Sequence, residues 1–472
     1  MRTSTSAGRR NFLKMSAAGA AGLSIASKVE TIFASSPAVT APGPGNKWPG
    51  RVVINFNKAA IGTSGADTTV IKKMVDDAIL KLTDQTTVAA AWKALFPASL
   101  TATSKIAIKI CTANAGLPAP HWSSVRAITD GLQQMDFSGT KFAAANITIY
   151  EMNVTGFSSA GYTATNFPGI SIKADTAVNG GDGALSNRTY AQTLKNAAFL
   201  INVFSPRGHN IGSTFTIGFK SHFGTYSNPS GMHTNAAQNL RDINCSGPIY
   251  TKNVLSVCSG IYGMNESNGP AGSADNYSTY SKTMDASSTA TSPTTIIMST
   301  DPISCEMQTI KMMRINKKGA YATANMPDYL KASGGAAVSG WSPINTIGTI
   351  DETKMDIRKI INGNSTTSIR PIGNGGRAAH GADIIAHQIQ GHNSTFIEFT
   401  LPNEHVGKDA SIEIYDISGA LIQRFTRNVQ GIRNHFSWDE KDARGSLVSK
   451  GRYVVRLVSG AMQASTHCVI MR

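Results

Sequence analysis

The sequence predicts an α/β domain with a largely parallel or mixed sheet flanked by helices, followed by a small all-β sandwich. Up to about residue 314, apolar strand-like runs alternate with segments of helical periodicity. From residue 395 onward, short runs of alternating polar and apolar residues are separated by turn signals. Of the 472 residues, 41% are hydrophobic and 15% are charged, which excludes both a disordered chain and a small disulfide-stapled protein.

The α/β part is expected to span residues 48–361. Residues 51–56 form its first strand, and residues 68–82 form a helix behind an Asp67–Thr68 cap. Further strands are expected at 106–111, 147–150, 198–204, 254–258 and 295–298, and further helices at 123–135, 190–197 and 302–314. The run 198–204 is apolar throughout, as in a parallel strand buried on both faces. In such sheets, binding sites lie where loops leave the carboxyl ends of the strands.

The C-terminal part changes character. Residues 362–392 are rich in glycine without a sustained period and are interpreted as a linker, although residues 383–386 are a candidate for pairing. The sandwich is expected over residues 393–472. Its expected strands are 396–399, 411–415, 421–425 and 452–457, with turns at 416–419 and 442–445.

The N-terminus carries a targeting pattern. Gly8-Arg9-Arg10-Asn11-Phe12-Leu13-Lys14 matches the bacterial twin-arginine motif and precedes a mild Ala- and Gly-rich apolar segment. Residues 1–34 are therefore expected to be a signal peptide read by the twin-arginine translocase, and residues 35–47 a flexible leader. No other stretch has the length of a membrane span. We expect an exported protein of the periplasm, cell surface or extracellular space.

The charge and the cysteine content of the chain limit the classes of partner and cofactor that it is expected to bind. The net charge of the chain is +15, of which +4 lies in residues 1–34 and +2 in residues 393–472, so about +9 remains on the α/β part. No basic run with interleaved aromatic residues occurs, which argues against nucleic acid. Among five cysteines none forms a CxxC pair, so no iron–sulfur cluster is expected. Cys245 and Cys258 are candidates for a disulfide, and buried free thiols are the alternative.

Polar residues gather after the apolar run 198–204, first at 205–210 and then at 218–224. Arginine and lysine supply charge for binding an anion, while imidazole supplies a proton or a metal ligand. The candidate catalytic residues are His209, Lys220 and Asp301, and the candidate ligand-binding residues are Arg207, Asn210 and His222. If a divalent metal is bound, its candidate ligands are His209, His222, Asp301 and Glu306.

Each of these assignments has a structural alternative. The histidines also fit a polar surface loop. Asp301 before Pro302 is a strong helix-capping signal. The functional alternative is that Asp301 or Glu306 faces the same crevice as His209 and supplies a carboxylate.

The order of these motifs resembles the bacterial family called domain of unknown function 362, over roughly residues 48–361. Arg207-Gly208-His209 corresponds to the family's Lys-x-His with Arg for Lys, and residues 219–224 correspond to its ALKNxFG-like segment with Ser for Asn. Ser299-Thr300-Asp301-Pro302 corresponds to its StDP segment. Cys258 and Glu306 stand where the family carries aspartates, which puts an acidic pair in doubt. The resemblance implies a fold more firmly than a reaction.

The last 80 residues resemble the immunoglobulin-like domain of flagellar hook-capping proteins and the C-terminal sorting domains of surface-secreted bacterial proteins. The resemblance rests on residues 412–419, Trp438-Asp439, Gly445 and residues 451–457. It implies docking to a secretion or surface-anchoring machinery. Trp438 and Tyr453 are expected to be core residues.

Two hypotheses for function follow. The first is an enzyme-like, metal-dependent or metal-free site in the α/β domain that acts on or binds a small polar or anionic ligand. The second is a noncatalytic cell-surface module that binds glycan or protein partners. The absence of the family's aspartates at positions 258 and 306 favours the second hypothesis. The polar groups at the strand ends favour the first.

Overall fold

The computed structural model describes residues 47–112, 119–152, 156–179, 181, 184–208, 215–264, 276–314, 326–365, 383–388, 394–416, 419–431, 433–460 and 462–470. The predicted signal peptide and nearly all of the leader lie outside these ranges. The chain divides into two compact units, residues 1–370 and residues 371–472.

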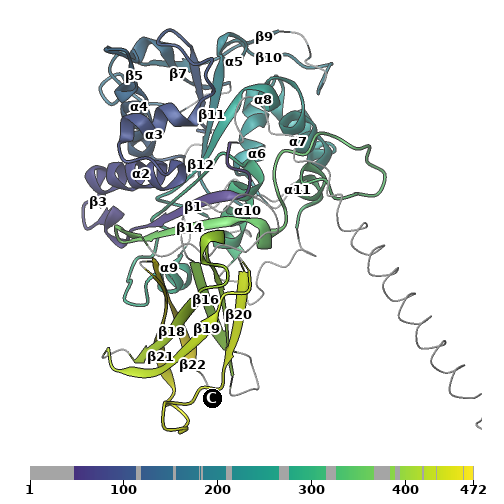
Figure 1. Cartoon of the computed structure of the whole chain (residues 1–472). Helices are drawn as coiled ribbons and strands as arrows, with labels where there is room; N and C mark the ends of the chain where they lie inside the picture. The colour runs from purple at the N-terminus through teal and green to yellow at the C-terminus, as the bar shows by residue number, and fades with distance from the viewer. Residues whose placement is uncertain are drawn as a thin grey trace, which may run out of the picture. The chain divides into compact units, whose positions relative to one another are not determined.

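The first unit is built on a nine-stranded mixed sheet (Figure 1). In spatial order its strands are β15 (Asn364–Ser365), β14 (Asp356–Ile361), β1 (Arg51–Phe56), β13 (Thr295–Ser299), β12 (Asn253–Gly260), β11 (Phe199–Phe204), β4 (Ile106–Lys109), β7 (Ile147–Glu151) and β8 (Ser171–Ala174). Most neighbours are parallel, but β13 runs antiparallel to both β1 and β12. Ser299, at its carboxyl end, pairs with Val52 near the amino end of β1 and with Ser256 in the middle of β12.

One face of the sheet is covered by α2 (Thr68–Thr83), α3 (Val88–Leu95) and α4 (Trp122–Gln134) (Figure 1). The helix α2 begins where the sequence predicted, because the Asp67 carboxylate accepts hydrogen bonds from the Thr69 and Val70 N–H groups. Its apolar side chains at three- and four-residue spacing are buried against the sheet. Trp92 of α3 is fully buried in the same core.

The other face carries more and shorter helices (Figure 1). They are α5 (Gln192–Asn196), α6 (Gly218–Ser221), α7 (Ala236–Cys245), α8 (Gly247–Lys252), α9 (Ser278–Met284), α10 (Pro302–Arg314) and α11 (Asp328–Ser333). Three two-stranded pieces complete the unit: β2 (Ile61–Gly62) with β3 (Gly65–Ala66), β5 (Asp136–Phe137) with β6 (Thr140–Lys141), and β9 (Ala177–Asn179) with β10 (Tyr190–Ala191). The predicted α/β class with helices on a mixed sheet is therefore confirmed.

The second unit contains two small antiparallel sheets, in agreement with the predicted all-β sandwich. One sheet holds β16 (Asp383–Gln388), β17 (Thr395–Thr400) and β20 (Arg433–Trp438). The other holds β19 (Leu421–Asn428), β18 (Asp409–Asp416), β21 (Gly451–Ser459) and β22 (Met462–Ile470). The segment 383–386, left open within the predicted linker, forms most of β16 and pairs with β17.

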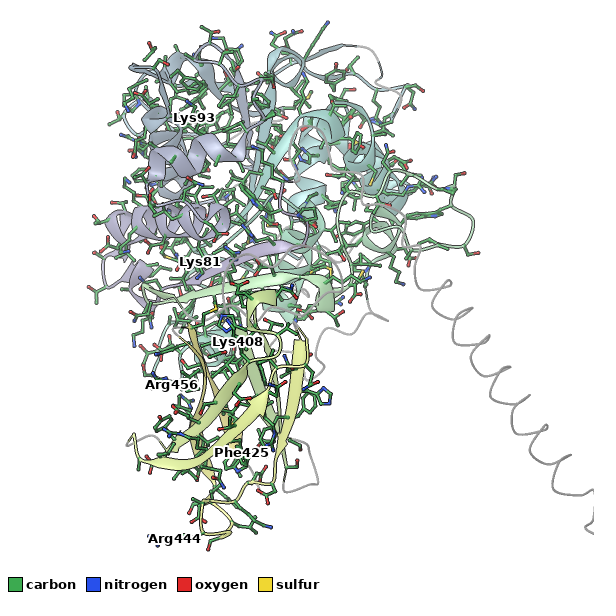
Figure 2. All side chains as sticks on the ribbon, viewed as in Figure 1. Lys81, Lys93, Lys408, Phe425, Arg444 and Arg456 are labelled. Carbon is green, nitrogen blue, oxygen red and sulfur yellow. The ribbon has the colours of Figure 1, made fainter. Side chains whose placement is uncertain are left out.

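The interior of the second unit is aromatic where the sequence predicted it. Trp438 is fully buried, Tyr453 is 6% exposed, and their ring centroids lie 5.8 Å apart in an edge-on arrangement. A second aromatic pair joins the two sheets, since Phe425 of β19, labelled in Figure 2, lies 4.5 Å from Phe436 of β20 between ring centroids. These rings therefore hold the two sheets together.

Two further predictions concern the chain as a whole. None of the helices in the described ranges combines the length and the hydropathy of a transmembrane span. All five cysteines are free thiols, so Cys245 and Cys258, both buried, follow the free-thiol alternative.

Gly131 provides a test of packing in this fold. A Cβ atom at this position of α4 would lie 2.0 Å from Trp92 Nε1, so Gly131→Ala should destabilise the domain by about 1–3 kcal/mol although alanine favours helix. Denaturant unfolding measures the change, with Gln134→Ala, a half-buried position of the same helix, as the control. A Gly131→Ala protein that is as stable as the wild type would contradict the packing.

Candidate functional site

A buried ion pair lies where two neighbouring parallel strands end. Lys109 is the last residue of β4 and Glu151 the last of β7, and the parallel register sets them side by side. Alternation along β4 puts Lys109 on the same face as Ala107, the face that α5–α8 cover. The Lys109 Nζ atom lies 2.8 Å from Glu151 Oε2, and both side chains are at most 2% exposed. Each charge is therefore neutralised by the other.

The next strand along the sheet, β11, brings a second cation to this edge. Arg207 follows the end of β11 by three residues and is 3% exposed. Its Nη2 atom donates a hydrogen bond of 2.6 Å to the sulfur of Cys111, which follows β4 by two residues. The carboxyl ends of β4, β7 and β11 thus meet where the α/β architecture places binding sites.

The segment 218–225, formed by α6 and the 3-10 turn η3 (His222–Thr225), is held over this edge by buried polar side chains. The Glu306 carboxylate accepts a hydrogen bond from the Phe219 N–H at 3.1 Å. Asn202 of β11 donates to the Gly218 carbonyl at 2.8 Å, and Asn244 of α7 donates to the Phe219 carbonyl at 3.2 Å. These bonds satisfy backbone groups that so short a helix leaves unpaired.

Lys220 is the unusual residue of this segment. It is 6% exposed, and its Nζ atom has no hydrogen-bond partner in the part of the chain that the structure describes. The ring of Phe223 lies 5.9 Å from that nitrogen. Burial and the positive charge of Arg207 lower the pKa of Lys220 to about 7, with the Cys111 sulfur acting in the opposite direction. Below about pH 7, where Lys220 is protonated, burying an ammonium that has no acceptor among the described residues is costly.

His222, in contrast, belongs to a satisfied network. Its Nδ1 atom lies 3.4 Å from Thr225 Oγ1, which in turn lies 3.1 Å from the hydroxyl of Tyr150. Burial, together with the charge of Lys109, lowers the pKa of His222 well below its ordinary value, so the imidazole is neutral. The backbone of Gly224 packs directly against the neighbouring ion pair, since a Cβ atom there would lie 2.0 Å from Glu151 Oε1.

Asp301 does not share this edge with Arg207 and Lys220, and His209, its expected neighbour in a common crevice, lies outside the described residues. Because β13 is antiparallel, its carboxyl end lies at the amino edge of the parallel strands, opposite to Arg207 and Lys220. The Asp301 carboxylate accepts hydrogen bonds from the N–H groups of Gly50, Ser304 and Thr349 at 2.9–3.2 Å. Asp301 therefore caps the start of α10, which is the structural alternative that the sequence offered. It also joins two loops to that helix.

The three candidate metal ligands that lie in the described ranges, His222, Asp301 and Glu306, are not brought together. Each oxygen of Glu306 already accepts a hydrogen bond, because Tyr329 also donates to it at 2.8 Å, and burial raises its pKa to about 8. Within the described ranges, no group of three His, Cys, Asp or Glu side chains is placed to hold a metal ion. His209 and Asn210 lie outside the described residues. The described candidates therefore do not form a metal site.

Sequence reasoning did not include Lys109, Glu151 and Cys111 among the site residues. The available signal was a lysine at the end of an otherwise apolar strand, since a charge buried in a sheet needs a partner. What was missing was the strand order. Only the placement of β4 between β7 and β11 shows that these residues lie together with Arg207.

A comparison with protein families agrees with the first of the two resemblances. Residues 106–311 match the family model described as domain of unknown function (DUF362). No curated protein matches the sequence.

The solved structures that resemble this chain include two hook-capping proteins. FlgD from P. aeruginosa matches at 15% identity over 18% of this chain and 64% of its own, with a TM-score of 0.14. FlgD from Xanthomonas campestris matches at 20% identity over 18% and 60%, also with a TM-score of 0.14. Dimeric latent PorU from Porphyromonas gingivalis matches at 20% identity over 23% and 11%, with a TM-score of 0.17. This chain covers less than two thirds of the length of each.

The raised pKa of Glu306 predicts how the stability of the folded protein depends on pH. Its pKa of about 8 in the folded protein exceeds the ordinary value of 4.5, so the folded state holds a proton that the unfolded state releases above pH 4.5. Wild-type stability should therefore fall by about 2–4 kcal/mol between pH 5 and pH 8 on account of this group. Glu306→Gln should lose that part of the slope in denaturant unfolding, whereas Asp328→Asn, at an exposed carboxylate of α11, should keep it. Equal slopes in wild type and Glu306→Gln would contradict the assignment.

Proposed function

We propose that the α/β domain binds a small anion at the carboxyl edge of β4, β7 and β11, through Arg207 and Lys220. The observation that carries the proposal is the buried Lys220 ammonium, which has no acceptor among the described residues. A carboxylate, phosphate or sulfate group supplies the missing acceptor and offsets the cost of burying the charge. Arg207 supplies a guanidinium, the group best suited to grip such a ligand.

The charges around the site support this assignment. Lys109 is neutralised by Glu151 at 2.8 Å, and His222 is neutral. Another buried carboxylate at this edge, Asp175, accepts hydrogen bonds from the N–H groups of Thr176 and Thr193 at 2.9 and 2.6 Å. The Lys220 ammonium is thus left without an acceptor among the described residues.

The rigidity of the site supports the same assignment. Glu306, Asn202 and Asn244 fix the segment that carries Lys220 before any ligand arrives. A preorganised cation binds an anion without an ordering cost. A buried cluster of this kind suits a small ligand better than the broad exposed contact that a glycan or protein partner requires.

Sulfate binding tests the proposal, because sulfate keeps its charge between pH 6 and pH 8.5. At matched ionic strength, sulfate should raise the melting temperature of wild type and of Lys195→Met, an exposed lysine on α5, but raise that of Lys220→Met much less. The comparison removes the general stabilisation that sulfate gives to any protein. The affinity of wild type should exceed that of Lys220→Met by about tenfold or more, which corresponds to about 1.4 kcal/mol.

Two further outcomes sharpen this test. Sulfate should bind more weakly at pH 8.5 than at pH 6, because Lys220 loses its proton as the pH rises through about 7, and Lys220→Arg should bind equally at both. Without sulfate, Lys220→Met should melt above wild type at pH 6, where the wild type buries a charged amine. Equal sulfate responses of wild type and Lys220→Met would overturn the proposal.

We also propose that the protein is exported in its folded state and that the C-terminal sandwich delivers or anchors it. The support is the twin-arginine motif at Gly8–Lys14 and the sequence pattern of residues 412–457, which resembles sorting domains. The partners would be the twin-arginine translocase and a secretion or surface-anchoring machinery.

Export depends on two adjacent arginines in this proposal. Arg9→Lys combined with Arg10→Lys should hold the full chain in the cytoplasm of a bacterium with a working twin-arginine pathway, while Arg2→Lys should be exported normally. Cell fractionation and immunoblotting measure the distribution. Normal export of the double variant, or of the wild type in a strain without the translocase, would contradict the proposal.

A further inference from the structure

Cys111 differs from the other cysteines of the chain. Cys245, Cys258, Cys305 and Cys468 are at most 2% exposed, whereas Cys111 is partly exposed. Burial is the main cause that raises the pKa of each of those four, to about 12 for Cys245 and Cys258 and to about 11 for Cys468. A thiol reacts through its thiolate, so these four are inert and serve as internal controls.

The surroundings of Cys111 are those of the anion site. Its sulfur accepts a hydrogen bond from Arg207 Nη2 at 2.6 Å. The Lys220 ammonium interacts electrostatically with both Arg207 and Cys111, so the three groups share one site although they come from three parts of the chain. The buried Lys220 Nζ, without a hydrogen-bond partner among the described residues, is an independent sign that a ligand enters here.

We propose that Cys111 is a nucleophile of this site and reacts with a small anion that carries an electrophilic carbon. The inference rests on the proposed function, because Arg207 and Lys220 hold the anionic group. Since the guanidinium that binds the anion is itself in contact with the sulfur, the electrophilic carbon must lie within one or two bonds of the charged group. The chemical class is therefore a short carboxylic acid, or a comparable oxyanion, with a leaving group next to its charged end.

The covalent step needs only the Cys111 thiol and the electrophile as reactants. The thiol releases its proton to solvent, and the sulfur electron pair forms a new bond to carbon. The bond between that carbon and its leaving group breaks, and the leaving group departs with the electron pair. Arg207 and Lys220 keep the carboxylate of the electrophile beside the sulfur during the reaction, which is a contribution of proximity.

Iodoacetate and iodoacetamide test the inference on the full folded protein. The two reagents deliver similar carbon centres, with iodide as the leaving group, but only iodoacetate is an anion. Peptide mass spectrometry measures the alkylation rate of each cysteine. Cys111 should react much faster than the four buried cysteines, and its ratio of iodoacetate to iodoacetamide rates should exceed that of free cysteine about tenfold. Sulfate should slow the iodoacetate reaction, and Lys220→Met should lower the ratio.

The failures of the two proposals are distinguishable. The sulfate-dependent rise in the melting temperature of the wild type measures the anion site separately from alkylation, because the anion is held by Arg207 and Lys220. If Cys111 reacts with neither reagent while sulfate still binds, the nucleophile is refuted and the anion site stands. If Cys111 reacts with both reagents without preference for iodoacetate, its assignment to the anion site is refuted. If Lys220→Met also leaves sulfate binding unchanged, the proposed function fails as well.

Discussion

The parallel pairing of β4 with β7 on one side and β11 on the other is the constraint on which the site depends. It brings the last residues of the three strands to one edge and leaves Lys109 without access to water. A lysine in that position is tolerated only with a carboxylate in contact, and Glu151 at the matching end of β7 provides it. Gly224 must then lack a side chain, because the Glu151 carboxylate occupies the space. The register of β4 and β7 thus constrains which side chains are tolerated at positions 109, 151 and 224.

The segment around α6 shows how buried polar groups hold a functional side chain in place. Four residues of helix have little stability of their own. Hydrogen bonds from Asn202 and Asn244 and to Glu306 tie the segment to β11, α7 and α10, so the backbone beneath Lys220 is fixed. The arrangement keeps a charged amine in a site from which water is largely excluded. Burying a protonated amine that has no acceptor among the described residues costs stability.

The two acidic candidates show how two carboxylates on one helix support different parts of the fold. Asp301 and Glu306 both lie at or near the start of α10 and both accept backbone hydrogen bonds, yet they support different parts of the fold. Asp301 caps α10 and joins it to loops at the amino edge of the sheet. Glu306, one turn further, reaches the segment of Lys220. Cys258 and Glu306, which stand where the resemblance implied aspartates, are both buried.

The local elements could be predicted from the sequence, because periodicity and capping are local properties. The α2 helix with its Asp67 cap, the fully buried β11, the helix after Asp301–Pro302 and the aromatic core of Trp438 and Tyr453 were all predictable in this way. Only the tertiary structure decided that β13 runs against its neighbours, which separates Asp301 from Arg207 and Lys220. It also decided that Lys109, Glu151 and Cys111 meet at the site. Strand order and direction depend on contacts between segments tens to hundreds of residues apart, and no local pattern carries that information.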